Sequence, residues 1–203
     1  MIKIENASKI IKKQEILKNI NLEINCGDVV MIHGHNGSGK TMLLRLLCGL
    51  IKPSSGTVIT EQDVRFGVII ENPTFFQNES GFYNLKYLAT INKLIDDNEI
   101  DKWMKTFNLY EVKKKRVKSY SLGMKQRLAL SQAFMENPDV LLLDEPFNGI
   151  DDENLEITYE IFAHAKEKGQ IIVIASHVKI PVPDLITKEI RMSNGEIKSV
   201  TEF

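Results

Sequence analysis

The sequence predicts an α/β fold whose core is a mostly parallel β-sheet. Short, continuous apolar runs indicate strands that are buried on both faces of the sheet, and they lie at 28–33, 140–143 and 171–175. Segments of helical character alternate with these runs, at 40–49, 122–136 and 152–168. Such alternation is typical of parallel sheets, because each crossover between parallel strands needs a long connection.

The two ends of the chain indicate a small antiparallel β layer in addition. Residues 2–5 and 20–24 alternate apolar and polar side chains, as half-buried strands do. The tail EIRMSNGEIKSV predicts a hairpin that turns at residues 193–195, and PSSG at 53–56 predicts a turn. Residues 80–118 are mostly helical and charged, so we expect an inserted helical subdomain there. Its apolar positions at helical spacing are Leu85, Leu88, Ile91 and Ile95.

The composition of the 203 residues favours one soluble globular domain. Its formal net charge is −1, whereas a nucleic-acid-binding domain usually carries a basic excess, so we expect no nucleic-acid partner. Two separated cysteines, Cys26 and Cys48, predict reduced, buried thiols. The first residues lack the apolar run of a signal peptide, and no stretch approaches the ~20 apolar residues of a membrane helix. We therefore expect a cytoplasmic protein that reaches a membrane only through a partner.

The segment GHNGSGKT at 34–41 matches the phosphate-binding pattern G-x-x-x-x-G-K-[ST], and it lies between a buried strand and a helix. Glycines allow the tight turn that points successive N–H groups at phosphate oxygens. Lys40 is expected to hold the β- and γ-phosphates of a nucleoside triphosphate, and the hydroxyl of Thr41 to ligate Mg2+; the loop alone leaves the class of NTPase open. The chain is therefore predicted to be a P-loop NTPase. The expected ATP contacts in this segment are Gly34, His35, Asn36, Gly37, Ser38, Gly39, Lys40, Thr41 and Met42.

A pair of carboxylates follows the second apolar run, in VLLLDEP at 140–146. Ligands of parallel sheets bind at the carboxyl ends of the strands, where Asp144 and Glu145 are delivered together. Asp144 is the expected metal-side carboxylate, which accepts a hydrogen bond from Mg2+-bound water. Glu145 is the expected general base, because a base needs a carboxylate close to the attacking water.

A helix start precedes this strand, in the segment YSLGMKQR at 120–127. Ser121 is a favoured N-cap residue, and the free N–H groups of a helix start suit an anion. We expect Leu122, Leu128 and Phe134 on the inner face of this helix.

Taken together, these segments resemble the motifs of the nucleotide-binding subunits of ABC (ATP-binding cassette) transporters, over essentially the whole chain. GHNGSGKT is similar to the family's Walker A motif, and VLLLDEP to its Walker B motif with the catalytic glutamate. NGID at 148–151 resembles the D-loop, with Asp151 matching, and ASH at 175–177 resembles the switch motif, with His177. YSLGMKQR resembles the family's signature, whose residues here are Ser121, Leu122, Gly123, Met124 and Lys125.

The resemblance implies how the protein works. Two copies are expected to bind head to tail, so that each ATP lies between the Walker A loop of one copy and the signature of the other. Lys40, Glu145 and His177 are the implied catalytic residues, with His177 contacting the γ-phosphate and holding the attacking water. Integral membrane subunits are the implied partners, at the inner face of the cell membrane. The implied division is a nucleotide-binding core at 1–76 and 121–203, and a helical subdomain at 77–120.

Two positions depart from the family pattern. Glu71, in FGVIIENP at 66–73, stands where the family usually has a glutamine that ligates the metal. This glutamate resembles the bacitracin- and lantibiotic-resistance branch, which implies export of, or immunity to, a peptide antibiotic; a loop acid without a role is the alternative. Ile11 occupies the position of the aromatic that usually stacks on adenine, so it is the expected base contact and leaves the ATP-versus-GTP preference open.

Other interpretations remain open from the sequence. A soluble, non-transport ABC ATPase and a nucleotide-gated interaction module are the alternatives to a transporter motor. The basic run KKKRVK at 113–118 is expected to be a solvated face, with attraction to an anionic membrane surface as the alternative. Aromatic residues after Glu71 fit either core packing or a groove for a helix of the membrane subunit, and they are Phe75, Phe76, Phe82 and Tyr83.

Overall fold

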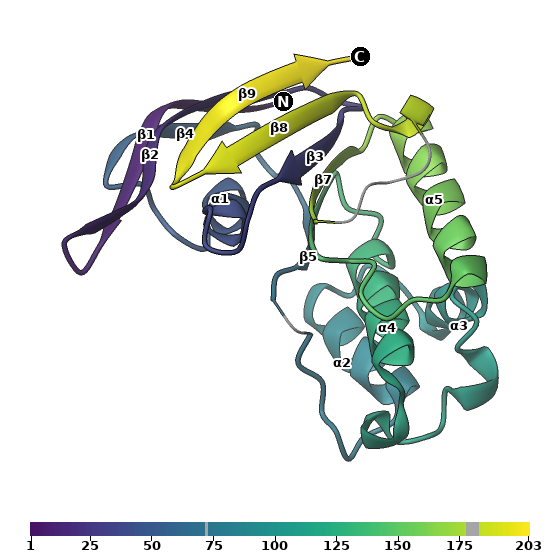
Figure 1. Cartoon of the computed structure of the whole chain (residues 1–203). Coiled ribbons are helices and arrows are strands. Elements are labelled where there is room, and N and C mark those ends of the chain that lie inside the picture. The colour runs from purple at the N-terminus through teal and green to yellow at the C-terminus, as the bar shows by residue number, and fades with distance from the viewer. Residues whose placement is uncertain (72, 178–182) are drawn as a thin grey trace.

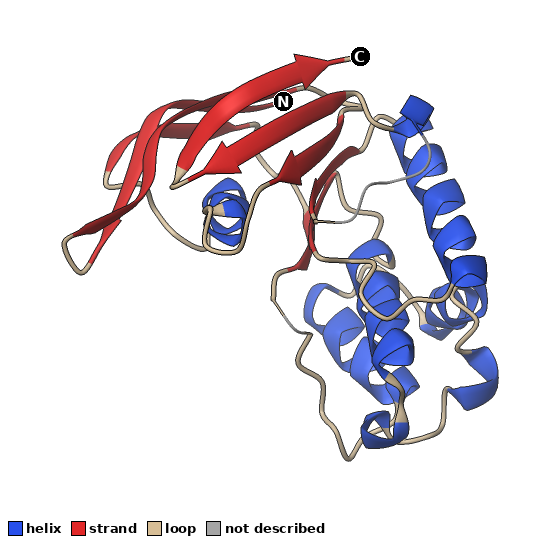
Figure 2. Ribbon diagram, viewed as in Figure 1, coloured by secondary structure: helices blue, strands red, loops and turns tan. Residues whose placement is uncertain are grey.

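A computed structural model describes residues 1–71, 73–177 and 183–203 of the chain. Two β-sheets lie together in one lobe, and helices α2, α3 and α4 lie in a second lobe at the lower right of Figure 1. The strand order is β2-β1-β4 in the three-stranded sheet and β5-β6-β7-β3-β8-β9 in the six-stranded sheet. This arrangement confirms the predicted mostly parallel core sheet with a small antiparallel layer and inserted helices (Figure 2).

The six-stranded sheet is parallel except at one edge. The three predicted apolar runs form its central strands β3 (Val29–His33), β6 (Val140–Asp144) and β7 (Ile171–Ala175), which are buried along nearly their whole length. Strands that the apolar runs did not predict complete the sheet: β5 (Phe66–Ile69), β8 (Lys188–Ser193) and β9 (Glu196–Glu202). Only β9 is antiparallel to its neighbour, because it returns from β8 through a two-residue turn.

The three-stranded sheet is antiparallel throughout, as predicted for the N-terminal end of the chain. The predicted strands at 2–5 and 20–24 belong to one long hairpin of β1 (Ile2–Ile11) and β2 (Gln14–Ile24). The third strand is β4 (Ser55–Thr60), so only the first half of the turn predicted at 53–56 lies outside a strand. The C-terminal hairpin was wrongly assigned to this layer: β8 pairs in parallel with β3 and joins the main sheet.

The helices surround the core sheet and form the second lobe. Helix α1 (Lys40–Leu47) buries its leucines between the two sheets, and α5 (Asp152–Glu167) packs against β7. Between residues 81 and 119 the described chain forms α2 (Gly81–Asn92), α3 (Asp97–Thr106) and two short 3-10 turns, Tyr110–Val112 and Val117–Ser119. Helix α4 (Leu122–Phe134) follows, and a third 3-10 turn covers Pro183–Leu185. The subdomain boundaries at 77 and 120 stay a prediction.

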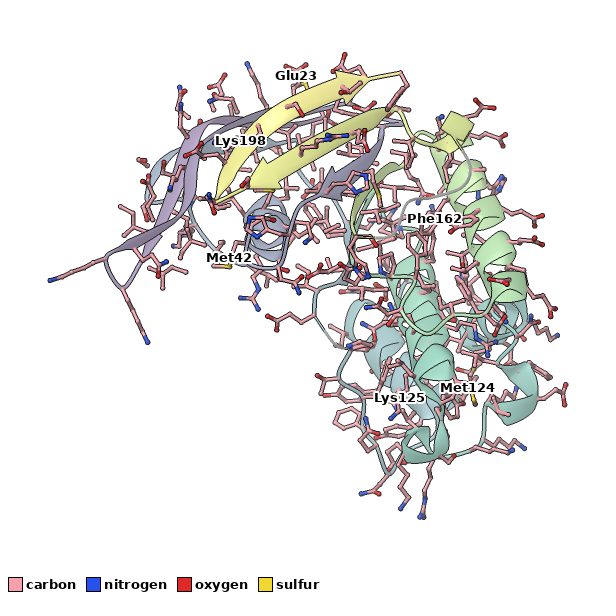
Figure 3. All side chains as sticks on the ribbon, viewed as in Figure 1. Glu23, Met42, Met124, Lys125, Phe162 and Lys198 are labelled. Carbon is pink, nitrogen blue, oxygen red and sulfur yellow. The ribbon has the colours of Figure 1, made fainter. Side chains whose placement is uncertain are left out.

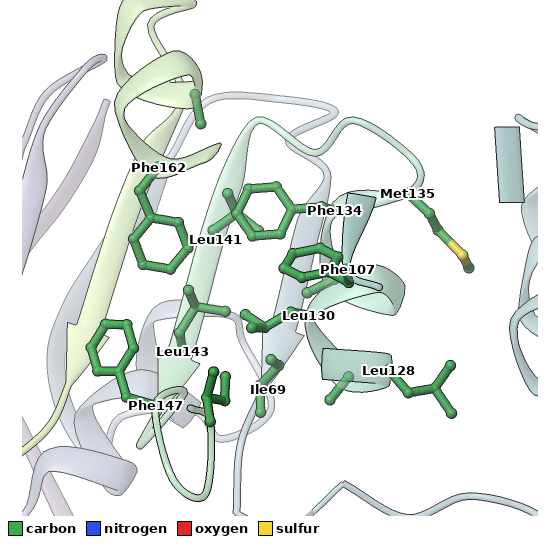
Figure 4. Packing of buried hydrophobic residues seen from close by; sticks show 14 of the residues in the cluster. Ile69, Phe107, Leu128, Leu130, Phe134, Met135, Leu141, Leu143, Phe147 and Phe162 are labelled. Atoms are coloured by element: carbon green, nitrogen blue, oxygen red, sulfur yellow. The ribbon is translucent and has the colours of Figure 1, made fainter. Parts of the chain in front are cut away.

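Aromatic side chains join the two lobes. Phe134 on α4 stacks against Phe162 on α5, with ring centroids 5.7 Å apart, and Phe162 also contacts Phe147 (Figure 4). Trp103 on α3 and Phe107 at the end of that helix pack against the same Phe134 ring. These contacts tie the helical lobe to the strands that carry the site residues.

Two residues expected in the interior, Leu122 and Cys26, are exposed, and so is Ile91, for which the sequence indicated only helical spacing. The side chain of Leu122 is 64% exposed, because it stands at the first turn of α4 and covers Gly149 instead of the core. Ile91 lies in the last turn of α2 on the solvent side, and Cys26 is exposed beside the N-terminus. Both cysteines are free thiols, and Cys48 is half-buried. No helix in the described ranges is long and apolar enough to cross a membrane.

Candidate active site

The phosphate loop connects the end of β3 to the start of α1, as the sequence predicted. Gly37 and Gly39 have φ angles of 81° and 108°, a region that favours glycine. A side chain at Gly34 would overlap the Ser38 hydroxyl and the Met192 carbonyl oxygen. The loop therefore needs its glycines both for its turn and for its close fit against β8.

The start of α1 is free to bind an anion. Its N-cap, Gly39, makes no side-chain cap, and the first turn carries no acidic residue. The first N–H groups of a helix lack partners within the helix and carry the positive end of its dipole, so they suit a phosphate group. Lys40 begins this helix, is 7% exposed, and donates from Nζ to the carbonyl oxygen of Gly34 at 2.8 Å. A buried cation beside free amides fits the triphosphate of ATP.

The metal-side residues Thr41 and Asp144 meet across the gap between α1 and β6. The Thr41 hydroxyl donates to Oδ2 of Asp144 at 2.6 Å. Burial raises the pKa of the Asp144 carboxyl and the charge of Glu145 raises it further, whereas the hydrogen bond from Thr41 and the charge of Lys40 lower it. Among the described residues no group of three or more His, Cys, Asp and Glu side chains could hold a metal. Thr41 and Asp144 fit Mg2+, which usually keeps several waters and binds substrate phosphates with one or two protein ligands.

Two of the three implied catalytic residues, Glu145 and His177, lie side by side. Glu145 has a positive φ of 47°, and its amide donates to the carbonyl oxygen of Ala175 at 2.8 Å. Its Oε2 lies 2.9 Å from Nδ1 of His177 and accepts a hydrogen bond from the Ser176 hydroxyl at 2.9 Å. Strands β6 and β7 are neighbours, so residues that follow them directly must be close. Ser176 was not expected from the sequence, although a hydroxyl at the end of a buried strand is a signal for such a site.

The structure places Glu71 differently from the expected metal ligand. Its Oε1 lies 2.6 Å from NH2 of Arg45 in an exposed ion pair, and its φ angle is 62°. Its backbone amide, not its carboxylate, approaches Asp144 and lowers the pKa of that carboxyl. Arg45 was missed by the sequence analysis, although its place one helical turn beyond Thr41 is a signal. Residue 72, within the expected 66–73 motif, lies outside the described residues.

The signature residues and the D-loop form a second group. Ser121 caps α4 by accepting a hydrogen bond from the Met124 amide at 3.2 Å, as predicted. A side chain at Gly123 would overlap the carbonyl oxygen of Gly149, so the signature packs directly on the D-loop. Asp151 caps α5 through the Asn154 amide at 3.0 Å. Figure 3 shows Met124 and Lys125 in the helical lobe, away from Met42 on α1.

The remaining expected ATP contacts lie at the rim of the loop. His35 and Asn36 are exposed, and His35 Nε2 lies 3.5 Å from the Ser193 hydroxyl. Ile11 ends β1, with its side chain 36% exposed next to the hairpin turn. It is accessible to a base, and its contact with adenine stays a prediction.

Comparison with known proteins identifies the family. The sequence model of a protein family described as "ABC transporter" matches residues 17–148 of the chain. The chain belongs to the ABC transporter family. The YybJ ABC transporter ATP-binding protein of Bacillus subtilis is 38% identical to this ABC subunit, over 98% of this chain and 95% of that protein.

Two further relatives carry names that state what they transport. The lantibiotic transport ATP-binding protein SrtF of Streptococcus pyogenes is 36% identical, over 91% of this chain and 83% of that protein. The bacitracin transport ATP-binding protein BcrA of Bacillus licheniformis is 34% identical, over 92% and 64%. The resemblance to this branch is confirmed.

Solved structures support the fold of the ABC subunit. A dimeric ATP-binding cassette in a post-hydrolysis state with ADP and Pi has a TM-score of 0.88 at 23% identity, and covers 100% of this chain and 98% of that chain. The cbiO1 subunit from Clostridium perfringens, part of the cbiONQ transporter complex, has a TM-score of 0.82 at 26% identity, over 99% and 88%. The ABC subunit binds and hydrolyses ATP as expected, and the family supplies such subunits to membrane transporter complexes.

We expect Lys40→Ala to weaken ATP binding roughly 10- to 100-fold, because a charge-assisted hydrogen bond contributes about 1.5–3 kcal/mol. Isothermal titration calorimetry with Mg-ATP measures the effect. Lys102→Ala on α3, where the lysine is exposed, is the control and should bind like the wild type. Equal affinities for the two variants would contradict the assignment of Lys40 to the phosphates.

Proposed function

We propose that this ABC subunit hydrolyses ATP through the residues of the phosphate loop, Asp144, Glu145 and His177, and drives a membrane subunit that exports or gives immunity to a peptide antibiotic. The observation that carries the proposal is the convergence of Lys40, Asp144 and Glu145 at the carboxyl edge of one parallel sheet. The contact of Glu145 with His177 favours turnover over a nucleotide-gated module that only binds.

The chain's own groups account for each step. The loop amides and Lys40 bind and orient the β- and γ-phosphates. The γ-phosphate then faces the carboxylate of Glu145. Glu145 takes the proton from the attacking water, and His177 holds that water against the γ-phosphate. Bound Mg2+, held through Thr41 and Asp144, supplies positive charge to the phosphate oxygens.

The signature requires a second copy of the chain. Within one chain the signature residues Met124 and Lys125, which directly follow Ser121 and Gly123, lie in the helical lobe, apart from Met42 on α1 (Figure 3). The N–H groups at the start of α4 can therefore reach a γ-phosphate only on a partner copy, which supports the head-to-tail dimer. ATP then acts as the contact between two subunits, and its hydrolysis releases them.

An exposed aromatic patch marks where the membrane subunit docks. Phe76, Tyr83 and Tyr87 are about half exposed, and the Phe76 ring meets the Tyr87 ring edge-on at 5.1 Å. By contrast Phe75 is buried, and Phe82 packs on the core and beneath Lys113. Exposed aromatics in contact with one another are typical of interfaces. Docking there places the subunit at the cytoplasmic face of the membrane.

The relatives support the proposed substrate class. SrtF and BcrA are named for lantibiotic and bacitracin transport, and the resemblance of Glu71 to that branch, noted from the sequence, points the same way. The aromatic patch and these relatives favour transport over a soluble, non-transport ATPase.

Glu145→Gln should lower ATP turnover about 100-fold or more, because it removes the general base but keeps the shape of the side chain. ATP should still bind, and ATP-bound dimers should accumulate. Phosphate release and size-exclusion chromatography with ATP test this. The control is Glu153→Gln, at an exposed position in the first turn of α5. Undiminished turnover in Glu145→Gln would rule out the proposed base.

Glu71→Gln should change the turnover rate or its coupling to transport while ATP affinity stays within about twofold. The substitution removes the ion pair with Arg45, and an exposed pair contributes only about 0–1 kcal/mol to stability. Calorimetry and phosphate release on the same preparation separate binding from turnover. Outright loss of nucleotide affinity would count against a role for Glu71 that is limited to rate and coupling.

Tyr87→Glu should abolish association with the membrane subunit and leave ATP binding unchanged, because it places a charge within the aromatic patch, against the Phe76 ring. Co-purification with the polytopic membrane protein encoded in the neighbouring reading frame measures association, and growth in bacitracin or a lantibiotic measures transport. Val200→Glu, an exposed apolar position on β9, is the matched control. Association that survives Tyr87→Glu would exclude this docking site.

A further inference from the structure

The two-residue turn between β8 and β9 lies against the phosphate loop, far from it in sequence. Asn194 and Gly195 have φ angles of 52° and 80°, as a type I′ hairpin turn requires. The pair Ser193 and Glu196 closes the hairpin on either side of the turn. The sequence analysis predicted this hairpin but gave the turn no role at the nucleotide site.

The peptide groups of Gly195 join two separate parts of the nucleotide site. Its amide donates to the carbonyl oxygen of Ser38 in the phosphate loop at 2.9 Å. Its carbonyl oxygen accepts from the amide of Lys18 on β2 at 2.8 Å. Lys18 follows Leu17, which pairs with Lys9 on β1, the strand that ends with the expected base contact Ile11. Gly195 therefore connects the phosphate loop to the β1–β2 hairpin, which is expected to contact the base.

The bond to Ser38 determines where a loop amide points. A trans peptide is planar, with its C=O and N–H on opposite sides. Since the Ser38 carbonyl points at Gly195, the Gly39 amide of the same peptide points away from the turn, to the opposite side of the loop. The Ser38 amide is already bound within the loop, to the His35 carbonyl at 3.0 Å.

The packing around the turn leaves no room for a side chain at Gly195. An added Cβ would overlap the carbonyl oxygen of Ile16 on β2. The phosphate loop is also tightly packed on its side of the contact: a Cβ at Gly39 would lie 3.2 Å from Leu17, 3.3 Å from Met192 and 3.4 Å from the Gly195 Cα. A shift of the turn would therefore move either β2 or the phosphate loop.

We propose that the Asn194–Gly195 turn is a positioning element for the nucleotide, and that Gly195 is its positioning residue. It orients the Ser38–Gly39 peptide for the phosphates and holds the β1–β2 hairpin at a fixed distance from the loop. The proposal rests on the proposed ATP site. It makes nucleotide affinity depend on a residue that touches neither phosphate nor base.

Gly195→Ala tests this against Gly169→Ala. Both glycines have a φ of 80°, so both variants place an alanine in the left-handed region, but an added Cβ at Gly169 meets nothing within 4 Å. Calorimetry with Mg-ATP, well below the melting temperature of each variant, should show about tenfold weaker binding for Gly195→Ala and wild-type binding for Gly169→Ala. Equal affinities in the two folded variants would overturn the proposal.

Hydrogen exchange of the wild type gives a second test that does not depend on the folding of a variant. Mg-ATP should slow exchange of amides in 16–19 and 193–196 as well as in the phosphate loop, while amides around Gly169 stay unchanged. Unaltered exchange in both segments would overturn the proposal. Wild type that binds no ATP would instead refute the proposed function, so the two failures are distinguishable.

Discussion

The common register of three parallel strands is the constraint on which the site depends. Asp144 at the end of β6 pairs with Ala175 at the end of β7, and Ala175 pairs with Ile32 near the end of β3. All three strands therefore end at the same level. The residues that follow them are the phosphate loop, Glu145 and the pair Ser176–His177, and they must meet at one edge. A shift of one strand by a residue would separate them and turn each side chain to the other face of the sheet.

Charge compensation explains why this edge tolerates groups that proteins rarely bury. Lys40 and Asp144 are both nearly inaccessible, and each would be costly to bury alone. Lys40 binds the Gly34 carbonyl, and Asp144 accepts from Thr41 while its pKa is raised by burial. The free amides of α1 add partial positive charge. The site thus holds donors and a cation on one side and carboxylates on the other, which suits a metal-bound triphosphate between them.

The core strands and the phosphate loop were predictable because their signals are local. Continuous apolar runs identify β3, β6 and β7, and the glycine spacing identifies the loop. Pairing is not local: nothing within the C-terminal hairpin indicates that β8 adds to β3, or that β5 forms the opposite edge. The Glu71–Arg45 ion pair was missed for the same reason, since its partners are far apart in sequence. Leu122 was placed inside together with Leu128 and Phe134, but it stands in the first turn of α4 and lies over Gly149.

The division of the site between two lobes gives ATP a mechanical role. The phosphate loop belongs to the sheets, whereas the signature and the aromatic patch of Phe76, Tyr83 and Tyr87 belong to the helical lobe. In the proposed dimer, ATP holds the helical lobe of one copy against the sheets of the other. The stacked rings of Phe134 and Phe162 connect the two lobes. The signature and the aromatic patch belong to the same helical lobe, so in the proposed dimer a movement that nucleotide imposes on the signature would also move the patch, where the membrane subunit would receive it.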